Sequence, residues 1–402
     1  MNSKKRVTTD FIYTVGATVI LNAVLQVIVY PLINRIGGQE SLGNVTYFMS
    51  IVNITMNSIG MAVCNNRLAL HNKFETKNGD YLFYLAILIP IAVVVSILIL
   101  SSDLVLIDYL LIAVLIVFAC LRAYGTVQYR IVLSYNKYFF AFLSCSIGYL
   151  IGTGIFYVFR HWQIVFIFGE LVGFIFVFFT GNVLKFDGKS ENLFKVFKST
   201  IILSCSTLIY EITTNADRLI LKNFDSAKSV SLYYTVSSVP KLLFMLSLPI
   251  NNIILTYVAN KKMVLNKKTF VKLTAVFSGL GLMFYLGSVI GIPIFMKILY
   301  SNLWRDGKAY MFTIPIIVVI DLICSMIANL IFAKFGSKYH LMIFGSFLLY
   351  YAPLAIIGTN QNGIIGFIQF AIIAEVIKYV LIVLFGIYKY SKNEKVTQIE
   401  EV

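Results

Sequence analysis

The sequence is poor in charged residues, histidine and tryptophan. Charged residues make up 13% of the 402-residue chain, and it contains 3 histidines and 2 tryptophans. Hydrophobic residues make up 59%, which is more apolar surface than one soluble core of this length can bury. The composition therefore excludes an ordinary soluble protein and predicts an integral membrane protein.

Motifs for metal, redox and nucleotide chemistry are also missing. The histidines are far apart in the sequence, and no G-x-x-x-x-G-K-[ST] loop is present. The cysteines lack C-x-x-C or any other metal-ligand spacing and lie singly in or beside apolar segments: Cys64, Cys120, Cys145, Cys205 and Cys324. We therefore expect no metal site, no cofactor, no catalytic residue and no ATP hydrolysis.

Long uncharged runs are what the sequence has instead. Four of them, residues 11–34, 41–66, 138–159 and 273–296, exceed the ~20 residues that cross a bilayer as a helix. We expect an all-α integral membrane protein with about twelve transmembrane helices. Their approximate ranges are 10–32, 44–65, 82–101, 105–128, 138–159, 162–184, 197–218, 230–257, 270–297, 309–333, 339–358 and 363–388.

Polar segments divide these spans into two halves. The stretch KFDGKSENLFKVFK, residues 185–198, falls near the midpoint and is predicted to link them. The expected domains are an N-terminal six-helix lobe with its linker (1–195), a C-terminal six-helix lobe (196–390) and a cytoplasmic tail (391–402). Because six is even, the two lobes would have the same orientation in the membrane.

The distribution of lysine and arginine predicts the orientation. These residues concentrate in the loops that are cytoplasmic if the N-terminus is cytoplasmic, so both termini are expected inside the cell. The net charge of +15 is explained by this asymmetry and by attraction to anionic membrane lipids, and no nucleic acid needs to be invoked.

Two stretches in corresponding places of the halves have the same plan of apolar segment, basic residue, polar turn, aromatic residue and apolar segment. They are Pro31–Ile54 and Ala216–Leu243. Within them, NRIGG at residues 34–38 with Gly43, and ADRLILKNF…SLYY, resemble the polysaccharide transporters, or lipid-linked oligosaccharide flippases, of the multidrug/oligosaccharidyl-lipid/polysaccharide (MOP) exporter superfamily. Ser231 departs from the pattern, because the second repeat commonly has glycine there.

The resemblance implies a MATE-like pair of six-helix lobes that acts as a transporter and not as an enzyme. Its members move undecaprenyl-diphosphate-linked oligosaccharides from the cytoplasmic to the outer leaflet of the bacterial cell membrane, for capsule or exopolysaccharide assembly. They do so by alternating access, with the first, second, seventh and eighth helices lining the cavity. The expected partners are the lipid-linked oligosaccharide, H⁺ or Na⁺ as coupling ion, and polysaccharide assembly proteins.

Charged residues inside the predicted spans are the candidates for the site. A charge at the bilayer centre costs at least ~2.5 to 3.5 kcal/mol, so each one needs a partner or water. If the implied cavity exists, we expect Arg218 and Lys241 to bind the diphosphate, since a guanidinium and an ammonium both form strong bonds to phosphate oxygens. The structural alternatives are a pair of Arg218 with Asp217 or a lipid headgroup, and a pair of Lys241 with Glu211.

Uncharged and acidic groups complete the predicted cavity. The amides form two i, i+4 pairs, one on each of the first two helices, and could equally form interhelical hydrogen bonds worth about 0.6 kcal/mol each. The residues expected to contact sugar or line the cavity are Asn22, Gln26, Asn53, Asn57, Asp217 and Glu211.

Four further residues in the spans are candidates for ion coupling: Glu170, Asp321, Glu375 and Lys378. Glu170 and Asp321 are expected as unpaired carboxylates, which in a low-dielectric site can carry a proton or stay neutral as structural acids. Glu375 and Lys378 lie at i, i+3 on one helix and could simply neutralise each other. Arg122 is expected to extend towards the cytoplasmic interface.

Two competing functions remain open. A multidrug extrusion antiporter would have an acidic or apolar cavity. A membrane-embedded polysaccharide polymerase or glycosyltransferase would carry a long extracytoplasmic loop or a cytoplasmic catalytic domain, whereas the longest predicted loop here is residues 67–81.

Overall fold

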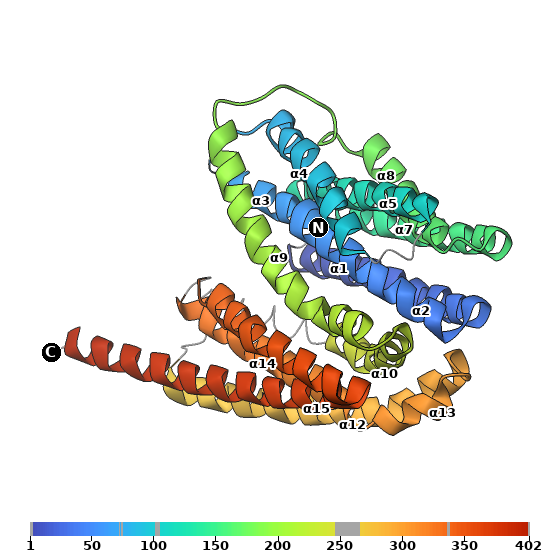
Figure 1. Ribbon diagram of the computed structural model, residues 1–402. Helices are drawn as coiled ribbons and strands as arrows, with labels where there is room; N and C mark the ends of the chain where they lie inside the picture. Colours follow the sequence, from blue (N-terminus) through green and yellow to red (C-terminus); the bar gives the residue numbers. More distant parts are fainter. Residues whose placement is uncertain are drawn as a thin grey trace. The chain divides into compact units, whose positions relative to one another are not determined.

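The computed structural model describes residues 3–71, 73, 75–100, 105–245, 266–335 and 338–400. Every regular element in these residues is a helix (Figure 1). The chain divides into two compact units, residues 1–215 and 216–402.

The first unit begins with a nearly continuous helical stretch and continues with shorter helices. The stretch contains two π-helical segments, η1 and η2, each of which adds a residue to a helical turn. Its elements are α1 (Ser3–Ala23), η1 (Val24–Val29), α2 (Tyr30–Thr55), η2 (Met56–Met61) and α3 (Ala62–Leu70). The rest are α4 (Asn78–Ile99), α5 (Leu106–Gly125), α6 (Val127–Ile131), α7 (Tyr135–Phe159), α8 (Gln163–Thr180) and most of α9 (Leu193–Phe224).

The second unit contains the end of α9 and the helices that follow it. These are α10 (Ala227–Met245), α12 (Lys267–Leu299), α13 (Trp304–Gly307), η3 (Lys308–Tyr310), α14 (Ile314–Phe335) and α15 (Lys338–Glu400). Its core lies among α12, α14 and α15, where the Phe270 and Tyr390 rings stack 4.8 Å apart and the Tyr390 hydroxyl donates to the Leu330 carbonyl at 2.8 Å. These contacts hold the last long helix against the other two.

Nine helical stretches in the described residues are long and apolar enough to cross a membrane. Two of them, Thr9–Leu70 and Met342–Lys392, have 62 and 51 residues, well above the ~20 that one crossing needs. The backbone leaves helical geometry at Gly38 in the first and at Asn362 and Gly363 in the second, so each stretch holds two crossings. The all-α membrane fold is thereby confirmed. The predicted eighth span, 230–257, begins in α10, and its last residues lie outside the described part of the chain.

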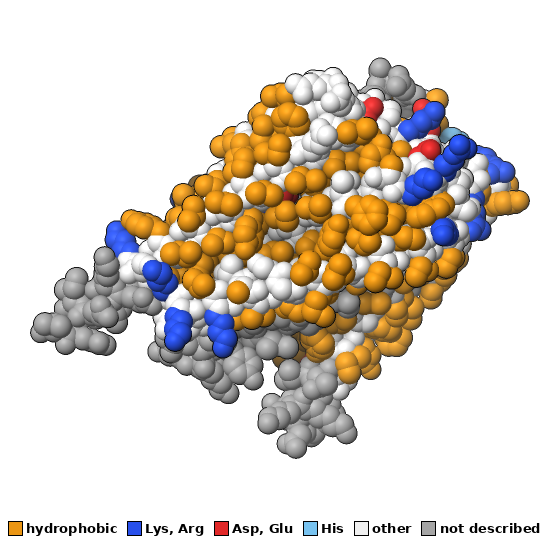
Figure 2. All heavy atoms as spheres, turned by 90° about the horizontal axis from the view of Figure 1, so that it is seen from below, with side chains coloured by type: hydrophobic (Ala, Val, Ile, Leu, Met, Phe, Trp, Pro, Cys, Tyr) orange, Lys and Arg blue, Asp and Glu red, His pale blue; other side chains and the backbone are white. Residues whose placement is uncertain are grey.

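The surface of the helices is strongly apolar. Large hydrophobic side chains such as Leu98, Phe179 and Leu349 are more than three-quarters exposed. Figure 2 shows hydrophobic side chains over much of the visible face, with lysine and arginine gathered towards its edges. This is the pattern of a surface that faces lipid in the middle and water at the ends.

The predicted linker is bound to the first unit. Asp187 accepts hydrogen bonds from the backbone N–H groups of Asn78 and Gly79, at 2.6 and 3.3 Å, where α4 begins. Ser190 donates to both carboxylate oxygens of Asp80, from its backbone N–H at 2.8 Å and its hydroxyl at 2.7 Å. Because these carboxylates satisfy donors in and beside the first turn of α4, the polar segment is an ordered part of the unit and not a free spacer.

The boundary between the compact units falls inside α9 and not in this linker. The first part of α9 is tied to the first unit, because Tyr84 donates to Ser204 at 2.9 Å and Asn66 donates to Thr200 at 2.7 Å. The predicted lobes, 1–195 and 196–390, divide the chain before α9. That division into two sets of six helices stays a prediction.

Close packing of α7 on α8 depends on glycines with G-x-x-x-G spacing. A Cβ atom at Gly148 would lie 2.4 Å from the Phe168 carbonyl oxygen, and one at Gly152 would lie 2.7 Å from the Val165 Cα. Neither position has room for a side chain because backbone atoms occupy the space.

We expect Gly152→Val to push α8 away from α7 and to lower the free energy of unfolding by about 1–3 kcal/mol. Thermal unfolding of the purified protein in detergent measures this loss. Gly154→Val is the matched control on the same helix, because a Cβ there meets no atom within 4 Å. Equal losses for the two variants would show that close packing at Gly152 is not the cause.

Candidate functional site

Lys241 and Asp217 form an ion pair between α10 and α9. The Lys241 Nζ donates to the Asp217 Oδ2 at 2.9 Å. Pro240 precedes the lysine within α10. Because proline has no N–H to donate to the preceding turn, the helix lacks one backbone hydrogen bond next to Lys241. The structure thus pairs Lys241 with Asp217, whereas the structural alternative considered from the sequence was a pair with Glu211.

Aromatic rings surround the two basic groups. The Arg218 guanidinium lies 5.3 Å from the centre of the Tyr234 ring, and the Lys241 Nζ lies 5.7 Å from that of Tyr233. Both distances allow cation–π attraction. Arg218, Asp217 and Lys241 together carry a net charge of +1, so this corner of the second unit is basic although Lys241 is paired.

Glu211 lies about two helical turns before Asp217 on α9, in the first unit. Its side chain forms a hydrogen bond with Asn57 of η2, and its carbonyl accepts from the Asn215 amide at 2.9 Å. Both Glu211 and Asn57 are half-buried. The structure therefore joins two of the predicted lining residues to each other.

The other predicted amides lie on the first two helices. Asn22, Gln26 and Asn53 are all half-buried. The Asn22 amide donates to the Thr18 carbonyl at 2.8 Å, which is a local bond within α1. Gln26 lies in the π-helical segment η1. A contact of these amides with sugar stays a prediction.

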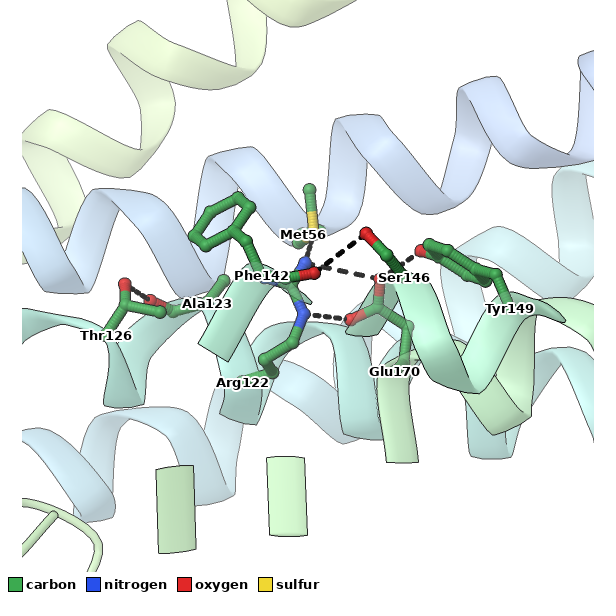
Figure 3. Close-up of polar contacts among 8 residues, drawn as sticks. All are labelled: Met56, Arg122, Ala123, Thr126, Phe142, Ser146, Tyr149 and Glu170. Carbon is green, nitrogen blue, oxygen red and sulfur yellow. Dashed lines mark hydrogen bonds and ion pairs between the residues drawn. The ribbon is translucent and has the colours of Figure 1, made fainter. Parts of the chain in front are cut away.

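Arg122, Glu170 and Tyr149 form a buried polar group in the first unit (Figure 3). The Arg122 Nε pairs with one oxygen of Glu170, while the Arg122 Nη2 and the Tyr149 hydroxyl donate to the other at 3.2 and 2.7 Å. Arg122 also contacts the Met56 sulfur at 3.4 Å and faces the Phe142 ring at 5.5 Å. The group brings together α5, α7, α8 and η2.

This group corrects two expectations. Arg122 does not extend to the interface, because its side chain is 6% exposed and bound to Glu170, and Glu170 is not an unpaired carboxylate. In an apolar medium, pairing two opposite charges from neighbouring helices costs less than exposing either one. Arg122 is the one basic residue in the predicted spans of the first half, and Glu170 is an acidic residue well inside another of these spans. This coincidence was the signal that could have revealed the pair.

Lys378 lies between two carboxylates in the second unit. Its Nζ is 2.7 Å from Glu375 on the same helix and 2.6 Å from Asp321 on α14. The i, i+3 contact was anticipated. Asp321 was expected to be unpaired and is not, because the packing of α14 on α15 brings it to the lysine. The three residues carry a net charge of −1.

Among the described residues, no group of three or more histidine, cysteine or acidic side chains is arranged to hold a metal ion. The ion pairs described above instead consist of cations bound by carboxylates. Such groups can bind a phosphate through the cation, or a proton or a small cation through a carboxylate.

No protein-family model and no curated protein matches the sequence. Solved structures do match the fold. An inward-facing multidrug resistance MATE family transporter of the MOP superfamily is 15% identical with a TM-score of 0.69, covering 94% of this chain and 95% of that one. The lipid II flippase MurJ in an inward closed conformation is 18% identical with a TM-score of 0.67, covering 97% and 90%.

The MATE transporter VcmN of Vibrio cholerae, in its bent form, is 14% identical with a TM-score of 0.57 and 98% coverage of each chain. The likeness extends over nearly the whole chain in all three cases. It confirms the expected MATE-like fold, and with the apolar helices it shows a multi-pass membrane protein.

We expect Arg122→Ala and Glu170→Ala each to cost about 3–5 kcal/mol of stability, because each leaves a buried charge without its partner. The double variant should lose much less than the sum of the two, since both charges are then gone. Thermal unfolding in detergent tests this, with Lys137→Ala, an exposed lysine on α7, as control. Additive losses would mean that the two side chains do not depend on each other.

Proposed function

We propose that the chain is a flippase for undecaprenyl-diphosphate-linked oligosaccharides. It moves them by alternating access from the cytoplasmic to the outer leaflet of a bacterial cell membrane, with both termini in the cytoplasm, for surface polysaccharide or exopolysaccharide assembly. The fold shared with transporters that include a lipid II flippase supports this proposal. Polysaccharide assembly proteins would consume the product.

The physical task explains why buried basic groups matter. A diphosphate cannot enter hydrocarbon unaided, because even one uncompensated buried charge costs several kcal/mol or more. A protein can replace the lost hydration with cations and hydroxyl or amide groups while the polyprenyl chain stays in lipid. Arg218 and Lys241 supply the cations, and Asn22, Gln26, Asn53 and Asn57 are our candidates for the sugar.

The observation that carries the proposal is the position of Lys241. It lies in α10, within the predicted span 230–257, and its side chain is 35% exposed while its carboxylate partner is 7% exposed. A partly exposed cation within a predicted span is suited to an anionic ligand. Arg218 adds a second cation beside it.

The acidic groups are our candidates for ion coupling. Asp321, Glu375 and Lys378 have one carboxylate more than they have cations, which leaves a place for H⁺ or Na⁺. Glu170 is also a candidate, although its charge is matched by Arg122.

A multidrug antiporter is the second candidate, and one observation favours it. The Asp321 side chain is 42% exposed, and an exposed carboxylate within a span suits a cationic compound. The fold likeness to a multidrug transporter is compatible with this function as well.

In cells that lack the protein, we expect lipid-linked oligosaccharide to accumulate in the cytoplasmic leaflet, because its diphosphate has no path across. Wild type should relieve the accumulation, whereas Lys241→Ala and Arg218→Ala should reduce relief about tenfold or more by removing a cation from the diphosphate. Leaflet-specific labelling of the lipid-linked sugar measures this.

Lys228→Ala is the matched control, since Lys228 is an exposed lysine in the first turn of the same helix as Lys241. If loss of the protein instead sensitises cells to cationic drugs and leaves both leaflet populations unchanged, the second candidate replaces the first.

Flipping should also respond to membrane potential. Moving a headgroup with roughly two negative charges out of an inside-negative compartment is favoured by ~2.3 kcal/mol per charge per 100 mV. We expect an imposed inside-negative potential to accelerate outward flipping in proteoliposomes and the opposite potential to slow it. Equal rates in both polarities would contradict a net outward movement of negative charge.

A further inference from the structure

The ion pairs between the helices differ in which partner has the more exposed side chain. In the Arg122–Glu170 pair both side chains are closed off, at 6% and 5% exposure. The Lys378 side chain is 2% exposed, whereas the side chain of its partner Asp321 is 42% exposed. In both pairs the side chain of the cation is at most 6% exposed.

The pair of Lys241 with Asp217 has the opposite arrangement. Here the cation is 35% exposed and the carboxylate 7%. Asp217 is also held from its other oxygen, because its Oδ1 accepts the Arg218 backbone N–H at 2.9 Å. An incoming anion would therefore meet a lysine whose ammonium is engaged by a fixed internal carboxylate.

We propose that Asp217 occupies Lys241 as an internal substitute for the substrate's phosphate, and that the diphosphate takes the lysine from it by exchange. This inference rests on the proposed function. It says what Lys241 binds when the diphosphate site is empty and how the diphosphate is released. Asp217 is a positioning residue and does not itself bind the diphosphate.

The exchange avoids an unpaired charge at any stage. If Lys241 stood alone in an empty site, or if the diphosphate left without a replacement, the buried charge would be uncompensated. With Asp217 beside it, the Lys241 ammonium can move from the Asp217 carboxylate to a phosphate oxygen and back, because its four-carbon side chain is flexible. Asp217 meanwhile keeps its bond from the Arg218 backbone and stays close to both cations.

Competition from Asp217 lowers the apparent affinity for the substrate. Only the fraction of molecules whose lysine has left the aspartate is ready to bind, and the apparent dissociation constant rises in proportion. The same competition speeds release, because the aspartate takes the lysine back. Removing the carboxylate should therefore tighten binding and slow the final step of transport.

Asp217→Asn and Asp217→Ser test this, since both remove the charge and one keeps the shape. The assay is the dissociation constant of geranyl diphosphate for the purified full-length protein in detergent, measured by calorimetry. We expect each variant to bind about tenfold or more tightly than wild type, and Asp217→Glu, which keeps the charge, to bind like wild type.

A second substitution connects the gain to the lysine. In the Lys241→Met background, Asp217→Asn should give no increase in affinity. Asp80→Asn is the matched control, because it also removes a buried carboxylate, but one that binds Ser190 at the start of α4 and not Lys241. It should leave diphosphate affinity unchanged. In proteoliposomes Asp217→Asn should lower the half-saturating substrate concentration and also the maximal rate.

If the folded Asp217 variants bind the diphosphate no more tightly than wild type, or more weakly, Asp217 is a structural counter-ion and the inference is overturned. If wild type and all variants bind no diphosphate, the proposed function fails with it. The inference alone fails when wild type binds and flips its substrate but removal of the Asp217 charge brings no gain in affinity.

Discussion

Charges inside apolar helices must be paired, and this requirement determines much of how the chain is built. Hydrocarbon offers no hydration, so every arginine, lysine or carboxylate within a span either finds an opposite charge or reaches water. The Arg122–Glu170 pair brings α5 and α8 together, Lys378 connects α14 with α15, and Lys241 connects α10 with α9. Each pair thus serves as a specific contact among surfaces that are otherwise mostly apolar.

The pairs serve different purposes because their surroundings differ. Where both partners are enclosed, as with Arg122 and Glu170, the pair is a fixed structural element, reinforced by the Tyr149 hydroxyl. Where one partner is reachable, the charge on that side can interact with a ligand. In the second unit the lysine is the more exposed partner of the Lys241–Asp217 pair, and the carboxylate is the more exposed partner of the Lys378–Asp321 pair. The unit so combines features suited to anions and to protons or small cations.

The membrane class, the apolar spans and the MATE-like fold could be predicted from the sequence, because they follow from run length, composition and two short resembling stretches. The contact of Glu375 with Lys378 could also be anticipated, since it lies within one helix. The partners of Arg122, Asp321 and Lys241 could not, because each lies on another helix and helix packing decides the choice. The ordered structure of residues 185–198 could not be predicted for the same reason, because it depends on hydrogen bonds of Asp187 and Ser190 to residues at the start of α4.

Helix α9 has a consequence for any attempt to divide this protein into separately made halves. Its first turns are bound to Asn66 and Tyr84 in one compact unit, while Asp217 near its end is bound to Lys241 in the other. A cut before α9 would take Ser204 and Thr200 from their partners, and a cut after it would leave Lys241 without its carboxylate. Helix α9 therefore contributes contacts to both units, and a cut at either of its ends deprives one of them of such a contact.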